Sequence, residues 1–125
     1  MKKVVLCLAL IVGLLASAST AMAQTTYNLE IAGVQVTSAN CSDLSVISGV
    51  SGTVKYDPST KTLTLQNATI QINTINAIES SIDGLTIKVI GTNNLTTGDY
   101  VALFFTRPLT ITGGGVLNEI GRAHV

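Results

Sequence analysis

The sequence predicts an all-β protein in which N-terminal β-hairpins precede a parallel β-helix, or β-solenoid. Apolar residues recur at every second position from Tyr27 onward, which is the period of a strand with one buried face. Three stretches that begin LTL or LTI start at Leu63, Leu85 and Leu109. A strand-borne period in the low twenties is typical of one coil of a solenoid. The alternative is a β-sandwich, whose strands alternate in the same way and whose turns are also closely spaced.

Residues 24–62 are predicted to form the N-terminal hairpin and cap region. In the stretch EIAGVQV, Ala32–Gly33 indicates a tight bend between two short strands. The stretch GTVKYDPSTKTLTLQN indicates a longer hairpin, in which Asp57-Pro58-Ser59-Thr60 makes the turn. We expect Val54 and Tyr56 on one arm of this hairpin and Leu63 and Leu65 on the other.

Residues 63–118 are predicted to form the coils, which are incomplete. Because stacked strands lie about 4.8 Å apart, like residues of successive coils pack on one another. We expect one ladder of Leu63, Leu85 and Leu109 and a second of Leu65, Ile87 and Ile111. Ala77 should match Ala102 between the ladders, and the glycines and asparagines of GTNN and TGGG should lie at corners.

Residues 1–23 resemble a secretory signal peptide. A short basic start precedes the apolar run Val4–Leu15, which is too short to span a bilayer, and Ala21-Met22-Ala23 fits the cleavage rule. We therefore expect a secreted, periplasmic or outer-cell-surface protein with no membrane span after cleavage. Cys41 is then the single cysteine of the mature chain, and it is expected to act as a small apolar residue.

Residues 119–125 are predicted to be an artefactual tail. A widely used sequencing adapter, translated in one frame, reads Ile-Gly-Arg-Ala-His-Val and then a stop codon, which is the sequence of 120–125. Arg122 and His124 would then form no site. We expect the natural coils to continue past Asn118, and we expect this fragment to self-associate through its uncovered last rung.

Composition argues against several classes of function. From Gln24 to Asn118 the chain has four cations and six anions, without the basic patch that nucleic acid binding needs. No histidine or cysteine pair has zinc spacing. Asp83 and Asp99 are the one carboxylate pair expected at equivalent ends of successive coils, as a glycosidase would need, but solvated turn residues are the favoured interpretation. We therefore expect no enzyme activity and no cofactor, with calcium left possible.

Carbohydrate binding is the favoured function. Sugars are bound by aromatic faces and by amides or carboxylates, and the stretch GTNNLTTGDY gathers such groups near one predicted corner. The candidate ligand-binding residues are Asn93, Asn94, Asp99 and Tyr100. The alternatives are a structural or adhesin stalk without a glycan ligand, and a fragment of a polysaccharide lyase or hydrolase.

The stretches YNLEIAGVQVTSAN, GTVKYDPSTKTLTLQNATI, GLTIKVIGTNNLTTG and LTITGGGVLN resemble a family of secreted proteins of Bacteroidota and Firmicutes type. The resemblance covers residues 27–118. It implies a right-handed parallel β-helix related to carbohydrate-binding domains, some of which bind acidic plant polysaccharide with calcium. The shared stretches shape a coil, and no binding motif among them assigns a ligand to a residue.

Overall fold

The computed structural model describes residues 24–122 of the 125-residue chain, and this part is all-β apart from one short 3-10 helix. The expected signal segment 1–23 and residues 123–125, which include His124, lie outside the described residues. Within the described part, no helix has the length and apolar character needed to cross a bilayer. In chain order the elements are β2 (Thr26–Ile31), β3 (Val34–Thr37), η2 (Leu44–Val46), β4 (Val50–Asp57), β5 (Thr62–Gln71), β6 (Ile78–Ser80), β7 (Leu85–Ile90), β8 (Thr92–Val101), β9 (Leu103–Phe105), β10 (Leu109–Thr112) and β11 (Val116–Arg122).

Two antiparallel hairpins form the N-terminal part, as the sequence predicts. β2 and β3 pair across the bend at Ala32–Gly33, and β4 and β5 pair with Tyr56 opposite Leu63. At the β4–β5 turn the Asp57 carboxylate accepts hydrogen bonds from the Ser59 hydroxyl at 2.7 Å and the Ser59 N–H at 2.9 Å. These bonds hold the pKa of Asp57 below its ordinary value, because they favour the ionised carboxylate.

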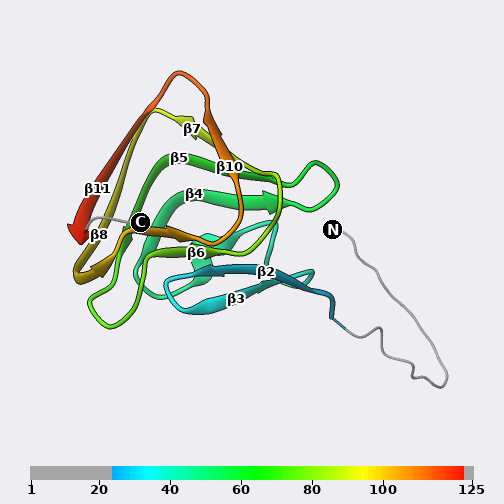
Figure 1. Ribbon diagram of the computed structural model, residues 1–125, viewed down its shortest axis with the longest axis horizontal. Coiled ribbons are helices and arrows are strands. Elements are labelled where there is room, and N and C mark those ends of the chain that lie inside the picture. The colour runs from blue at the N-terminus through cyan, green and yellow to red at the C-terminus, as the bar shows by residue number, and fades with distance from the viewer. Residues whose placement is uncertain (1–23, 123–125) are drawn as a thin grey trace, which may run out of the picture.

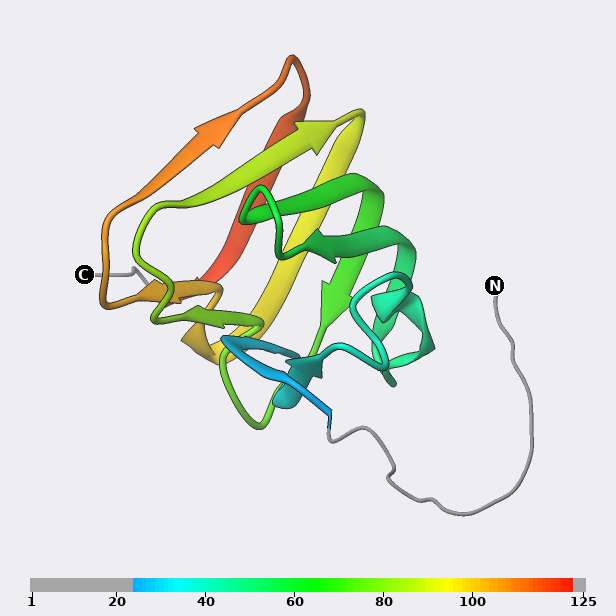
Figure 2. The ribbon, with the colours of Figure 1, turned by 90° about the vertical axis from the view of Figure 1, so that its right-hand side faces the viewer.

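From β5 onward neighbouring strands run parallel, and the sheet that they form curls. Its order is β10-β7-β5-β8-β11, with β4 antiparallel on the remaining edge of β5. β5 pairs with β7 through its first half and with β8 through its second half, so the sheet turns a corner and forms a half-barrel (Figures 1 and 2). A second sheet of order β3-β2-β6-β9 closes the lower side in Figure 1. These parallel pairings differ from the antiparallel sheets of the β-sandwich alternative.

The register of β5 differs by two residues from the expected ladders. Leu63 lies opposite Ile87, whereas Leu85 lies opposite Leu109 and Ile87 opposite Ile111. The expected ladder of three leucines is therefore wrong at Leu63, and the second expected ladder is wrong at Leu65, which lies opposite Val89. A shift of two residues leaves the same side chains facing inward, so the alternation of apolar residues does not reveal it.

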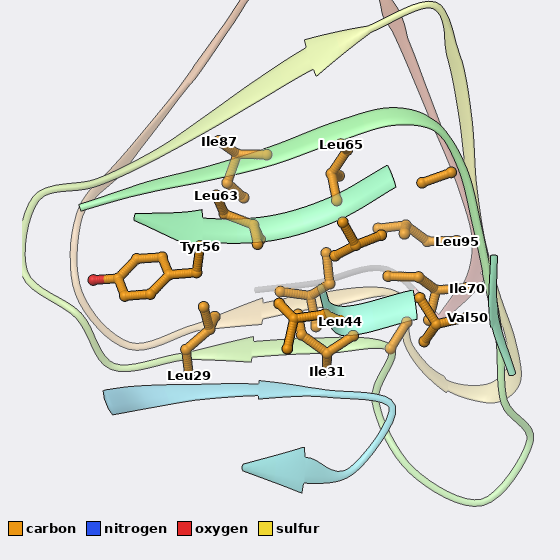
Figure 3. Packing of buried hydrophobic residues seen from close by; sticks show 14 of the residues in the cluster. Leu29, Ile31, Leu44, Val50, Tyr56, Leu63, Leu65, Ile70, Ile87 and Leu95 are labelled. Atoms are coloured by element: carbon orange, nitrogen blue, oxygen red, sulfur yellow. The ribbon is translucent and has the colours of Figure 1, made fainter. Parts of the chain in front are cut away.

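The core lies between the curled sheet and the second sheet (Figure 3). Leu44 of the 3-10 helix is fully buried in it, which fills the interior beside β4. Ala77 and Ala102 are also buried. Each lies one residue before a member of the pair Ile78–Leu103, so the expected match of the two alanines is confirmed. The largest fully buried side chains are Leu29, Ile31, Val36, Leu44, Leu63, Leu65, Ile70, Ile78, Leu85, Ile87, Leu95 and Leu103.

The last strand extends past the expected end of the coils at Asn118. β11 pairs in parallel with β8 as far as Arg122, so this strand continues into the segment that the sequence analysis assigns to an artefactual tail. Strand pairing uses backbone groups, which do not depend on an apolar alternation. No described strand covers the far edges of β10 and β11, and Ile111, Val116 and Ile120 on them are 46%, 50% and 56% exposed.

Candidate ligand-binding surface

Asn93, the first residue of the predicted ligand corner, is part of the fold. Its side chain is fully buried at the start of β8. The Oδ1 atom accepts a hydrogen bond from the Ala68 N–H at 2.8 Å, and Nδ2 donates to the carbonyl oxygens of Ile90 and Val116, each at 3.2 Å. One amide thus joins β5, β7 and β11. Because its donors and its acceptor are all engaged away from solvent, we remove Asn93 from the candidate site.

The other three residues of that corner lie on the outer face of β8 and on its bulge. Asn94 faces outward and accepts a hydrogen bond from Asn118 Nδ2 at 2.9 Å. Asp99 and Tyr100 are exposed near the far end of the same strand. β8 bulges between them, because β11 pairs with Thr96 through Ile120 and with Val101 through Arg122, only two residues later. Tyr100 therefore lies on the bulge, as an exposed aromatic residue apart from the regular strand that carries Asn94.

The two acids considered for catalysis occupy different positions in the repeat. Asp83 precedes Gly84, whose N–H donates to the Pro108 carbonyl at 3.2 Å. This register places Asp83 beside Arg107, in the next passage of the chain, and not beside Asp99. The expectation of equivalent positions for Asp83 and Asp99 is therefore corrected.

A groove of about 850 Å³ crosses the outer face of the curled sheet. Its floor consists of side chains from adjacent strands, with Thr62 beside Thr86 and Thr64 beside Lys88. We call this feature the threonine groove. It is lined by Cys41, Ser42, Lys55, Tyr56, Asp57, Pro58, Thr60, Thr62, Thr64, Thr86, Lys88 and Thr112.

A second hollow of about 460 Å³ lies on the other side of the β4–β5 turn, and Tyr56 and Pro58 line both features. We call it the Tyr27 hollow. The rings of Tyr27 and Tyr56 are 5.3 Å apart between centroids and tilted by 59°. The hollow is lined by Thr26, Tyr27, Asn28, Tyr56, Pro58, Lys61, Ser81, Ile82, Asp83 and Arg107.

The threonine groove and the Tyr27 hollow combine neutral hydroxyl groups with charged side chains. Burial is the main cause that raises the pKa of Tyr56, with smaller contributions from Tyr27, Asp57 and Cys41. A tyrosine of ordinary pKa is already protonated at neutral pH, and this shift extends the protonated, hydrogen-bond-donating form of Tyr56 to higher pH. Within residues 24–122, no group of three or more histidine, cysteine, aspartate or glutamate side chains is placed to hold a metal ion.

Sequence reasoning missed the threonine groove although part of the signal was present. In the stretches TLT, TIK and TIT the apolar residue faces the core, so the flanking residues face outward on the same surface. The Tyr27 hollow had no such signal, because its residues come from four separate segments of the chain.

The comparisons with known proteins leave the family of this chain open. No family model, no curated protein and no solved structure matches it. Any assignment of function must therefore come from the geometry of the threonine groove and the Tyr27 hollow.

Proposed function

We propose that this chain is a secreted, non-catalytic polysaccharide-binding module, and that its curled sheet forms coils of a parallel β-helix. The fold proposal is supported by the parallel pairing of β5, β7 and β10 and of β5, β8 and β11, at offsets of 24 to 25 residues except beyond the bulge in β8. Export is supported by the signal-like character of residues 1–23.

The observation that carries the binding proposal is the threonine groove. It runs across β4, β5, β7 and β10, so its floor repeats from strand to strand at about 4.8 Å. Thr64, Thr86 and Thr112 present hydroxyls that can donate and accept hydrogen bonds, as the hydroxyls of a sugar do, whereas the hydroxyls of Thr60 and Thr62 bond to each other. Polar side chains repeated from strand to strand suit a repeating polymer, and the groove's volume lies within the range of ordinary ligand sites.

Replacing the hydroxyls of Thr64 and Thr86 with methyl groups should weaken glycan binding without harming the fold. Val has the shape of Thr and favours strands, so the double variant Thr64→Val/Thr86→Val should melt at or above the wild-type temperature. Losing two neutral hydrogen bonds should weaken binding by roughly tenfold or more. Affinity gel electrophoresis against a panel of soluble polysaccharides, with and without calcium, measures the change.

Two variants control this experiment. Thr96→Val makes the same chemical change on the outer face of β8, and Tyr100→Ala removes the exposed aromatic ring of the corner predicted from the sequence. Both should leave glycan retention unchanged. Retention that responds to Tyr100→Ala and not to the groove variant would move the site to that corner. No retention on any glycan would favour the stalk alternative.

We also propose that the uncovered edge of β10 and β11 makes the chain self-associate. Ile111 lies opposite Ile87 on the inner side of the sheet but is 46% exposed, because no strand within residues 24–122 pairs with the far edge of β10. Ile111→Thr should lower the weight-average mass in sedimentation experiments at high protein concentration. Val46→Thr is the control, since Val46 is 72% exposed but lies on the 3-10 helix beside β4. A wild-type chain that remains monomeric would contradict the proposal.

A further inference from the structure

We propose that the Tyr27 hollow binds an anionic group of the ligand, a carboxylate or a sulfate carried by a sugar, through direct contact with Lys61 and Arg107. This inference rests on the proposed glycan-binding function and adds the chemistry of the bound sugar. It requires no metal ion.

The first argument is the distribution of cations. Residues 24–122 contain five lysines and arginines against seven aspartates and glutamates, so the region is net negative. Four of the five cations nevertheless line the two adjoining features, Lys55 and Lys88 in the threonine groove and Lys61 and Arg107 in the Tyr27 hollow. Arg122 is the exception. Each feature also contains one aspartate, Asp57 or Asp83, so cations outnumber anions two to one in each. This local excess of positive charge raises the local concentration of anionic ligands.

The second argument is the way in which the strands place Lys61 and Arg107. The Lys61 carbonyl accepts the Thr86 N–H at 2.8 Å, and its Nζ reaches the Asp83 backbone carbonyl at 3.2 Å. Arg107 precedes β10, next to Pro108, which accepts from Gly84, and β7 lies between β10 and β5. Backbone pairing therefore holds the two cations on the same side of the curled sheet, roughly two strand spacings or about 10 Å apart along the backbone. Both side chains line the hollow. Nζ contacts a carbonyl there and leaves its other two protons for a ligand.

The third argument is that the side chains lining the Tyr27 hollow suit the sugar ring that carries the anionic group. Tyr27 is half-buried and provides an aromatic face, on which the apolar face of a sugar ring can pack. The Tyr56 hydroxyl points away from the core cluster in Figure 3, and Asn28 adds an amide. A volume of about 460 Å³ is within the range of small-molecule sites.

Asp83 also lines the hollow, and its carboxylate sets the sharpest test. If an anion binds at Lys61 and Arg107, the negative charge of Asp83 opposes it, and Asp83→Asn should tighten binding a few-fold. If Asp83 instead serves a neutral sugar as a hydrogen-bond acceptor, the same variant should weaken binding. The substitution preserves size, so the direction of the change separates the two cases.

The experiment is an NMR titration of the ¹⁵N-labelled protein at low ionic strength with glucuronate, glucose 6-sulfate and uncharged glucose. We expect saturable shifts of the Gly84 and Arg107 amides with at least one charged sugar, none with glucose, and no effect of EDTA. Lys61→Asn and Arg107→Gln should each weaken binding by roughly tenfold. Asn tolerates the positive φ of 53° at Lys61, so the first variant should fold. Arg122→Gln is the control for general loss of positive charge and should change nothing.

The outcomes separate this inference from the function on which it rests. No saturable shift with either charged sugar, equal shifts with glucose, loss of binding in EDTA, or weaker binding by Asp83→Asn would each overturn it. Polysaccharide retention that depends on Thr64 and Thr86 would then still support the threonine groove. Shifts with glucuronate alone or with glucose 6-sulfate alone would identify which anion the hollow accepts.

Discussion

Replacing Asn93 with Asp should lower the free energy of unfolding by about 3 kcal/mol or more, although the two side chains have nearly the same shape. The Asp side chain retains an acceptor for the Ala68 N–H. It loses both donors, so the carbonyl oxygens of Ile90 and Val116 lose their bonds from this side chain, and it sets a carboxylate against them in a fully buried position. Urea denaturation followed by circular dichroism measures the loss.

Asn94→Asp is the matched control for this change. Asn94 is the next residue of the same strand, but it faces outward, is only partly buried, and bonds to one neighbour, Asn118. Its replacement should cost about 1 kcal/mol or less, because water can solvate the new carboxylate. Equal losses at the two positions would show that Asn93 does not link the strands as described.

The local features of the fold could be predicted from the sequence, whereas the register could not. Asp57-Pro58-Ser59-Thr60 is a turn by its own chemistry, and the structure confirms the hairpin around it. The pairing of Leu63 with Ile87 depends on how many residues the chain uses to return to the sheet. The repeated LTL and LTI motifs favoured pairing Leu63 with Leu85, two residues away, and that register buries the same side chains.

The candidate site was predictable only in part, for a related reason. Leu95 is apolar and two residues after Asn93, so strand alternation alone places Asn93 on the inner face. That signal was overridden by the usual association of asparagine with exposed corners. Lys61 and Arg107 are far apart in sequence and come together through pairing across successive passages. Composition alone therefore gives no indication of the Tyr27 hollow.

Gly52→Ala should be among the most destabilising single substitutions in the chain, with an expected loss of about 4 kcal/mol or failure to fold. Gly52 lies in β4 where β5 carries an extra residue and bends from β7 toward β8. Its φ is +81°, and an added Cβ would lie 2.3 Å from the Asn67 carbonyl oxygen and 2.7 Å from the Ala68 Cα. Backbone atoms cannot move aside as a flexible side chain can, so β4 would have to separate from β5.

Gly84→Ala distinguishes this overlap from backbone strain. Gly84 has the same φ of +81°, but an added Cβ there would meet nothing within 4 Å. This variant should lose only the cost of placing alanine in a left-handed conformation, about 1–2 kcal/mol. The difference between the two variants in urea denaturation therefore measures the close approach of β4 to the bend in β5. Similar losses at both positions would mean that β4 does not pack against that bend. The edge of β5 would then be less tightly covered than the register indicates.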